Sequence, residues 1–340
     1  MKIGMVSRFP PEKCGIAIYT NNLVTAMKDN KMDVITIGSM NSTADHKIKF
    51  HGISFASQIR QIIKDEQLDQ IHFQYIAPYF APKLLNQPFI KALNQDIPVT
   101  VTLHEVQYSN KGIKNKVLRH IENQICKKAK NIIVHSPLQQ KFLKNKGYNN
   151  ISTVLMGITP TNNKPKNNHH LLSFGILSKE KGHIHLLRAM KHLKNHKLTL
   201  AGNPVNQAYA DELQSYIKKH NLNHVTCDFG WISEKKKIQY FKDASIMIMP
   251  YIWGPYTSAV IADAVSYNIP VIVSEVGAVH EIAQEYNIGK VIHPNSHIAI
   301  QKAVLNVENN YTKYQKNITA YRKVANWNAV ALATHKLYKR

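Results

Sequence analysis

The amino-acid sequence predicts an α/β protein with two Rossmann-like, doubly wound domains that face a central cleft. Two observations carry this prediction. Strand-like apolar runs alternate with segments of helical periodicity, and a polar segment at 159–170 interrupts this alternation before it starts again. The length of 340 residues agrees, because one hydrophobic core rarely supports so long a chain.

The first domain is expected over residues 1–158, and it opens with a strand, a loop and a helix. Residues 2–7 are an apolar run that the loop 8–15 breaks. The helix that follows is marked by apolar residues at helical spacing, namely Ile16, Tyr19, Leu23 and Met27. Further strands are expected at 33–37, 70–74, 98–103 and 131–135. Ligands of such sheets bind at the carboxyl ends of the strands, which directs attention to the residues after each strand.

A linker at 159–170 leads to a second domain, 171–320, in which the same pattern starts again. Its strands are expected at 171–175, 197–201, 225–229, 245–250 and 270–274, and one of its helices at 257–267. Another helix face is marked by Ile184, Leu187, Met190 and Leu193. The tail 321–340 is predicted to be a helix that packs back toward the N-terminal domain.

The charge is the unusual bulk property of the chain. The sequence has 44 Lys and Arg against 21 Asp and Glu, a net charge of +23 that should attract anionic partners. A nucleic acid, an anionic membrane surface and a phosphate-bearing substrate each fit this charge, and so does a basic composition spread over a solvated surface. The lysines are scattered and no helix-turn-helix or RNP-type string occurs, so nucleic acid is the least supported partner.

The sequence predicts a cytoplasmic protein without a membrane span. It has no uninterrupted apolar run of about 18 residues, and its first residues read as a strand rather than as a signal peptide. The cysteines Cys14, Cys126 and Cys227 have no C-x-x-C spacing, so neither a disulfide framework nor a cysteine zinc site is expected. Cys14 is expected to be a small buried residue.

Because one fold can carry many functions, the function has to be inferred from short sequence motifs. No G-x-G-x-x-G follows the first strand and no P-loop is present. In their order and spacing, seven strings resemble family 4 of the GT-B glycosyltransferases, or glycosyl transferases group 1, along nearly the whole chain. They are FPPEKCGIAIYT (9–20), IHFQY (71–75), VTLHE (101–105), IIVHS (132–136), FGILSKEKG (174–182), LAGNP (200–204) and IPVIVSEVGAVHE (269–281).

The resemblance implies a GT-B fold and a retaining glycosyltransferase that needs neither a metal nor another cofactor. It would move a hexose such as glucose or mannose from a UDP- or GDP-activated donor to a lipid-linked, glycan or other cell-envelope acceptor. The first domain would bind the acceptor and the second the nucleotide sugar. The basic charge adds an anionic membrane surface as a partner for peripheral docking on the cytoplasmic face.

In the first domain, the resemblance assigns His104 to catalysis and Arg8, Gln74 and Tyr75 to the acceptor side. His104 follows the strand 98–103, where an imidazole can hydrogen-bond a sugar hydroxyl. A histidine that only caps the strand is the alternative, and His72 and His135 are expected to be structural in that sense.

Gly15 is expected to bind the donor. A missing side chain just before the first helix lets backbone amides and the positive end of the helix approach a phosphate or a sugar. An ordinary turn glycine is the alternative.

In the second domain, the resemblance places Lys181 in a catalytic role, because a lysine before a helix can neutralise a diphosphate. Donor binding is further assigned to Gly175, Ser178, Lys179 and Gly202. The family pattern also has a basic residue after Gly175, where this chain has Ile176. Lys179 is the candidate replacement.

The largest departure from the family pattern lies at two glutamates spaced eight residues apart. Pro255 stands at the first position and Asp263 at the second. Asp263 is assigned a catalytic role through the donor ribose, and Tyr256, Thr257 and Ser258 are expected to bind the diphosphate, with a plain helix cap at Thr257 as the alternative. Because the first glutamate is missing, a non-catalytic sugar-nucleotide or polyanion-binding protein on the same fold stays open.

The last donor-binding residues expected are Gly277 and Glu281, in the loop and helix start that follow the strand 270–274. In the family, the backbone of this loop faces the donor. Glu281 can equally be an acidic residue that interacts with the helix dipole.

Overall fold

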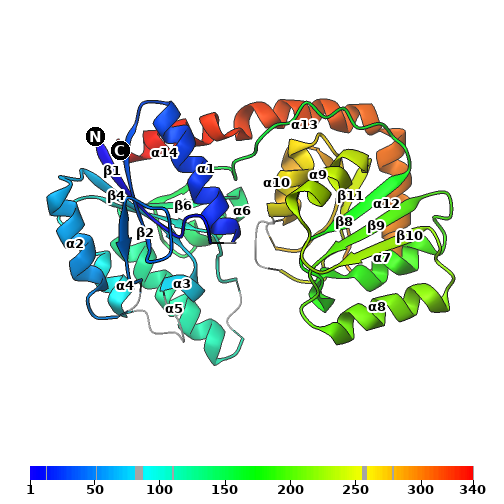
Figure 1. Ribbon diagram of the computed structural model, residues 1–340, viewed down its shortest axis with the longest axis horizontal. Coiled ribbons are helices and arrows are strands. Elements are labelled where there is room, and N and C mark those ends of the chain that lie inside the picture. Colours follow the sequence, from blue (N-terminus) through cyan, green and yellow to red (C-terminus); the bar gives the residue numbers. More distant parts are fainter. Residues whose placement is uncertain are drawn as a thin grey trace. The chain divides into compact units, whose positions relative to one another are not determined.

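The computed structural model describes residues 1–340 except 13, 51, 81–86, 109, 110, 255–258, 278 and 340. The chain divides into two compact units, Met1–Gly157 with Ala325–Arg340 as the first and Ile158–Val324 as the second (Figure 1). Each unit contains one parallel sheet with helices packed around it. The predicted fold class, two Rossmann-like α/β domains, is confirmed.

The described residues of unit 1 form a seven-stranded sheet in the order β3-β2-β1-β4-β5-β6-β7, in which every pair is parallel. The strands are β1 (Lys2–Val6), β2 (Asp33–Ser39), β3 (His46–Ile48), β4 (Gln70–Tyr75), β5 (Val99–Leu103), β6 (Asn131–Val134) and β7 (Ile151–Thr153). All residues of β4 and β5 are buried, as expected for central strands covered on both faces. The strand order reverses between β1 and β4, which makes their carboxyl ends the expected ligand position.

Seven helices among the described residues surround this sheet: α1 (Gly15–Asp29), α2 (Phe55–Asp65), α3 (Ala77–Phe80), α4 (Gln87–Ala92), α5 (Ile113–Lys128), α6 (Pro137–Lys144) and α14 (Trp327–Tyr338). Helix α6 begins at Pro137 because the side chain of Ser136 accepts a hydrogen bond from the amide of Gln139 and caps the helix. Proline is tolerated there because amides in the first turn have no hydrogen-bond partner within the helix. On the opposite face from α1, aromatic rings including Phe55, Phe80 and Phe89 form the core.

Helix α14 belongs to unit 1, although nearly 170 residues separate it from the rest of that unit. It lies beside α1 (Figure 1), and the ring of Trp327 covers Gly157, where a Cβ atom would come within 2.3 Å of the indole. At its other end the hydroxyl of Tyr338 lies 2.6 Å from Nδ1 of His72 in the middle of the sheet. Helix α14 therefore completes the core of the first unit.

The tail differs from the single helix expected at 321–340. Helix α13 (Tyr311–Ala325) ends before residue 326, and α14 begins after it. Asn326 is extended at φ −66° and ψ 157°, and its side chain accepts a hydrogen bond from the amide of Ala329. A helix N-cap in the middle of the predicted helix is the physical reason for the break.

The described residues of unit 2 form a six-stranded parallel sheet in the order β10-β9-β8-β11-β12-β13. The strands are β8 (His170–Phe174), β9 (Lys197–Gly202), β10 (Val225–Phe229), β11 (Ile246–Met249), β12 (Val271–Ser274) and β13 (Gly289–Ile292). The strand order reverses between β8 and β11, so their carboxyl ends are the expected ligand position of this unit.

The helices of unit 2 that the structure describes are α7 (His183–Met190), α8 (Gln207–Lys219), α9 (Glu234–Asp243), α10 (Ala259–Ser266), α11 (Val279–Glu285), α12 (His297–Asn309) and most of α13. Helices α7, α8 and α12 share one hydrophobic core with the sheet. Residues 159–169 contain neither helix nor strand. Among the helices of the described residues, none combines the length and apolarity that crossing a bilayer requires.

Candidate active site

In unit 1, Arg8 joins the loops that follow β1 and β4. Its Nε atom lies 3.1 Å from a carboxylate oxygen of Glu12, and its guanidinium lies 3.7 Å above the ring of Tyr79 on α3. Ion pairing and stacking therefore hold this cation at the point where the strand order reverses.

Gly15 is the first residue of α1 and is exposed. A Cβ atom built on it would meet no atom within 4 Å, so packing does not require a glycine there. The side chain of Cys14 caps the helix, with Sγ accepting from the amide of Ala17 at 3.3 Å. Cys14 is thus partly exposed, not buried as expected, because the cap places it at the helix end. The first turn of α1 carries no acidic residue, which leaves the positive helix end available to an anion.

His104 follows β5 and is 6% exposed, with protein atoms beside both ring nitrogens. Nδ1 lies 3.2 Å from Nε2 of His135, and Nε2 lies 2.9 Å from Oε1 of Gln74. The edge of Tyr19 closes one side, with ring centroids 4.9 Å apart. Any contact between His104 and a ligand would therefore have to replace one of these partners.

The protons of this network can be counted. Nδ1–H of His135 donates to the carbonyl of Val154 at 3.0 Å, so Nε2 of a neutral His135 accepts from Nδ1–H of His104. The Oε1 atom of Gln74 also accepts, so both contacts of His104 are satisfied together only when the ring carries two protons. Burial, reinforced by the nearby histidines, holds the pKa of His104 well below its usual range, and burial lowers that of His135 to about 4. His104 is therefore neutral at neutral pH and makes one of the two hydrogen bonds at a time.

The two other residues expected on the acceptor side are buried. Gln74 is fully buried at the end of β4 and contacts His104. Tyr75 packs against Phe80 and Phe89, and burial raises the pKa of its hydroxyl. Glu105, which the assignment from sequence missed, follows His104 and lines a small cavity with Tyr75. Burial raises the pKa of its carboxyl group, a property that side chains at functional sites often share.

In unit 2, Gly182 and Gly202 let backbone segments touch where a side chain could not fit. A Cβ atom on Gly202 (φ +144°) would lie 1.7 Å from the carbonyl oxygen of Gly175, and one on Gly182 (φ +69°) would lie 2.0 Å from that of Pro250. Gly175 itself has a φ of +121° and donates its amide to Ala201 at 3.0 Å. These contacts bring together the segments after β8, β9 and β11.

Lys181 lies between two of these segments. It ends a short 3₁₀ helix after β8, and its Nζ atom lies 3.8 Å from the ring centroid of Tyr251, which follows β11. The amide of Ile252 donates to the carbonyl of Glu180 at 2.8 Å and connects the same two loops. Burial lowers the pKa of Lys181 to about 8, so the side chain is still a cation at neutral pH. Tyr251 is a second residue that the sequence did not single out.

The neighbours of Lys181 differ in their surroundings. Ser178 is 2% exposed, and its hydroxyl has no hydrogen-bond partner among the described residues. The side chain of Lys179 is 77% exposed and forms an ion pair with Glu212 of α8 at 3.2 Å. Lys179 could replace the basic residue missing at Ile176 only after leaving Glu212.

Asp263 lies on α10 and is held by Lys237 of α9, with 2.9 Å between Oδ1 and Nζ. Its side chain is 31% exposed, and burial raises the pKa of the carboxyl group while Lys237 opposes that rise. The carboxylate thus already has a cationic partner. The expected diphosphate-binding residues Tyr256, Thr257 and Ser258, and Pro255 before them, lie outside the described residues.

Gly277 and Glu281 follow β12. Gly277 has a φ of +54°, the left-handed conformation that favours glycine. Glu281 is half-buried in the first turn of α11.

A large cavity lined by described residues of unit 2 lies elsewhere, beside the amino ends of β8, β9 and β10. It measures about 930 Å³ and contains three lysines and three histidines among its lining residues: Lys191, Lys194, Lys197, His170, His220 and His224. It is remote from Lys181 and Tyr251, because the amino and carboxyl ends of parallel strands lie at opposite edges of the sheet. This cavity therefore lies away from the expected donor position, and its lysines give it a positive charge.

Comparison with known proteins identifies the family. The sequence matches the model described as Glycosyltransferase Family 4 over residues 14–161 and the model described as Glycosyl transferases group 1 over residues 158–324. An uncharacterized glycosyltransferase of Methanocaldococcus jannaschii, MJ1178, is 23% identical over 378 aligned residues that cover 100% of this chain and 98% of that protein.

Solved structures share the fold. Sucrose-phosphate synthase from Thermosynechococcus elongatus has a TM-score of 0.76 at 18% identity, with 99% of this chain and 98% of that chain covered. Anabaena HepE in complex with UDP has a TM-score of 0.72 at 16% identity, with 99% of each chain covered, and HepE has also been solved with UDP-glucose. The two family models together match residues 14–324, and the chain belongs to the family 4 (group 1) glycosyltransferases of the GT-B fold.

Proposed function

We propose that this glycosyltransferase moves a hexose such as glucose or mannose from a UDP- or GDP-activated donor to a lipid-linked, glycan or other cell-envelope acceptor, with retention. The observation that carries the donor part is Lys181, a half-buried cation held over Tyr251 where the strand order of the unit 2 sheet reverses. A fixed positive charge at that position suits a nucleotide diphosphate. The complexes of HepE with UDP and UDP-glucose support a donor of this class.

The reaction breaks the bond between the anomeric carbon and the diphosphate oxygen, and the nucleoside diphosphate leaves with the electron pair. The acceptor hydroxyl oxygen forms the new bond to the anomeric carbon, and its proton passes to the leaving diphosphate. Lys181 would stabilise the negative charge that grows on the leaving diphosphate, since a preorganised cation in a partly buried site acts more strongly than one in water. Backbone amides near Gly277 and the start of α11 would add to this stabilisation.

The remaining residues receive roles that their surroundings allow. Gly15 would admit the donor to the open start of α1, and Arg8 would orient the acceptor beside Tyr79. His104 would offer one hydrogen bond to the donor sugar by exchanging a protein partner, with Gln74 as the residue that positions it. Asp263 would reach the donor ribose after releasing Lys237. The diphosphate-binding role of Tyr256, Thr257 and Ser258 stays a prediction.

Donor identity can be tested by thermal shift with UDP-, GDP-, ADP- and dTDP-sugars, because a ligand bound only by the folded protein raises the Tm. We expect a UDP- or GDP-hexose to raise it and to release nucleoside diphosphate when an acceptor lipid or glycan extract is added. Lys181→Met should abolish the shift, and the matched control is Lys218→Met, at an exposed lysine in the last turn of α8. A Tm that responds to no nucleotide sugar would contradict the donor class, and binding without release under any acceptor would favour the non-catalytic alternative.

For the acceptor, we propose peripheral docking on an anionic membrane surface at its cytoplasmic side. The basic cavity of unit 2, together with the net charge of +23, supports this surface as a partner. Each lysine near an anionic surface contributes about 1 kcal/mol, so replacing Lys191, Lys194 and Lys197 by Gln should weaken vesicle binding by up to about 100-fold.

Co-sedimentation with phosphatidylglycerol vesicles at low and high salt tests this proposal, with phosphatidylcholine vesicles as the neutral comparison. A matched variant replaces three exposed lysines of unit 1 by Gln, namely Lys127, Lys128 and Lys144. If both triple variants lost the same amount of vesicle binding, net charge would explain the effect, and the basic cavity of unit 2 would be refuted as the docking surface. Equal binding to both kinds of vesicle would refute membrane docking as a whole.

A further inference from the structure

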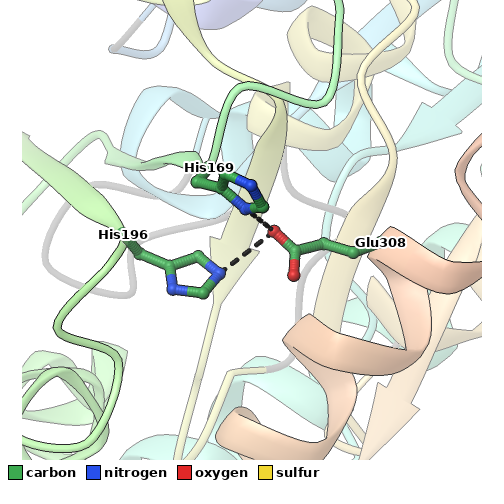
Figure 2. Close-up of side chains that lie close together, drawn as sticks. All are labelled: His169, His196 and Glu308. Atoms are coloured by element: carbon green, nitrogen blue, oxygen red, sulfur yellow. Dashed lines mark hydrogen bonds and ion pairs between the residues drawn. The ribbon is translucent and has the colours of Figure 1, made fainter.

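Two histidines and a glutamate converge at the edge of the unit 2 sheet that carries the amino ends of its strands (Figure 2). His169 precedes β8, His196 precedes β9, and Glu308 lies near the end of α12. The Oε1 atom of Glu308 lies 2.6 Å from Nδ1 of His169 and 3.0 Å from Nε2 of His196. One atom of each side chain lies within 4.8 Å of the other two.

Two of these three side chains are buried, and the third is exposed to solvent. The side chains of His196 and Glu308 are only 8% and 9% exposed, whereas that of His169 is 52% exposed. The backbone of His169 adopts a φ of +58°, a conformation uncommon in residues other than glycine, and this turn directs the ring onto Glu308. An ion can reach the group from solvent past His169.

We propose that His169, His196 and Glu308 bind a divalent transition-metal ion such as Zn²⁺. Two imidazoles and one carboxylate are a ligand set that such ions prefer, and three protein ligands leave a fourth position for water. Two neutral imidazoles and one carboxylate would leave a net charge of +1 on the bound dication. Chelation would then tie the first strand of the unit to α12.

The distances fit with a small adjustment. Metal–nitrogen and metal–oxygen bonds of about 2.0–2.1 Å at a tetrahedral angle separate ligand atoms by about 3.3 Å. The separations of 2.6 and 3.0 Å therefore have to widen by about 0.7 and about 0.3 Å. The exposed ring of His169 can make most of this movement, because solvent rather than packed side chains lies beside it.

The ring of His196 is free to change its tautomer. Its Nδ1 atom is buried and has no hydrogen-bond partner among the described residues, so no second bond fixes which nitrogen carries the proton. The same ring can thus donate Nε2–H to Glu308 without metal and offer the Nε2 lone pair to an ion. No metal was expected for the sugar transfer itself, and this group lies at the opposite edge of the sheet from Lys181.

The experiment titrates chelator-treated, metal-free full-length protein with Zn²⁺ by calorimetry and with Co²⁺ by visible absorption. Because the chain has 18 histidines, the measured quantity is the difference in bound equivalents between variants. The wild type should bind one equivalent of Zn²⁺ more tightly than any further equivalents. With Co²⁺ it should show absorption bands between about 500 and 650 nm, typical of four-coordinate sites. Excess Zn²⁺ should raise its Tm by roughly 3 °C or more.

His169→Asn and Glu308→Gln should each lose this equivalent, the cobalt bands and the gain in Tm. His169→Asn is safe for folding because that side chain is largely exposed. The matched control is His192→Asn, which breaks another histidine pair, stacked on His297 with centroids 6.5 Å apart and without a carboxylate ligand. The site would be refuted by equal stoichiometry in the wild type and His169→Asn, or by equal losses in His169→Asn and His192→Asn.

Discussion

Replacing Lys181 by Met should stabilise the protein while it removes activity. Burial lowers the pKa of Lys181 from 10.5 to about 8, so folding opposes its charge by about 3 kcal/mol at pH 7. The methionine keeps an apolar stem over Tyr251 but loses a cation–π contact of about 1–2 kcal/mol. The net gain is about 1–2 kcal/mol, which corresponds to a rise in Tm of roughly 2–8 °C.

The pH dependence of this gain has a defined sign. Below pH 8 both the folded and the unfolded wild type carry the charged lysine, so the full unfavourable contribution is present. Between pH 8 and 10.5 the folded protein loses the proton first, and wild-type stability gains on that of Lys181→Met. Urea unfolding of both proteins at pH 7, 8.5 and 10 measures the difference, which should be largest at pH 7.

The activity of the same variant should fall by about 100–1000-fold in kcat/KM, as expected when one group that stabilises a developing charge is lost. Lys181→Arg, which keeps the charge, should retain part of the activity, and the control variant Lys218→Met should keep all of it. A Lys181→Met protein that is less stable than the wild type at pH 7, or that transfers sugar at the wild-type rate, would refute the reasoning from burial and charge.

Three further predictions concern two glycines and a carboxylate. Gly202→Ala should lower the Tm by about 10 °C or more, because its Cβ would lie 1.7 Å from the carbonyl oxygen of Gly175; a melt followed by circular dichroism checks this. Gly15→Ala should change the Tm by less than about 2 °C, since the added Cβ meets no atom within 4 Å, but it should lower kcat/KM about tenfold. An unchanged kcat/KM would show that Gly15 is not part of the site. Asp263→Asn should cost at most about 1 kcal/mol in urea unfolding, because the ion pair with Lys237 is partly exposed, and should raise the KM for the donor; an unaltered KM would exclude the ribose role.

Most strands could be predicted from the sequence because they are short runs rich in apolar residues with polar boundaries. The run at 98–103, for example, became β5 at Val99–Leu103 with every residue buried. The short edge strands β3, β7 and β13 lack such a run and were not predicted. The break at Asn326 also had a visible signal, a capping residue followed by helix formers, which the periodicity of the tail obscured. Local chemistry thus carried most of the architecture.

The contents of the site depend on contacts between distant residues, which no local pattern contains. That His104 is neutral follows from its burial beside His135, which is 31 residues away in the sequence. Lys181 and Tyr251 meet only because the strand order places their loops side by side. Gly202 is expected to bind the donor, and its close approach to the carbonyl of Gly175 is a separate reason for glycine there, one that its position in the sequence does not reveal. The position of a residue after a strand predicts that it lies near the ligand, whereas its chemistry depends on packing against residues far away in the sequence.

The placement of α14 has a consequence for how the chain folds. Unit 2 is continuous in sequence, whereas unit 1 lacks the helix that covers Gly157 and reaches His72 until residues 325–340 have been made. At a synthesis rate of about 5–20 residues per second, the unfinished first unit waits roughly 10–30 s for that helix. The second unit therefore has all of its residues before the first unit receives its last helix.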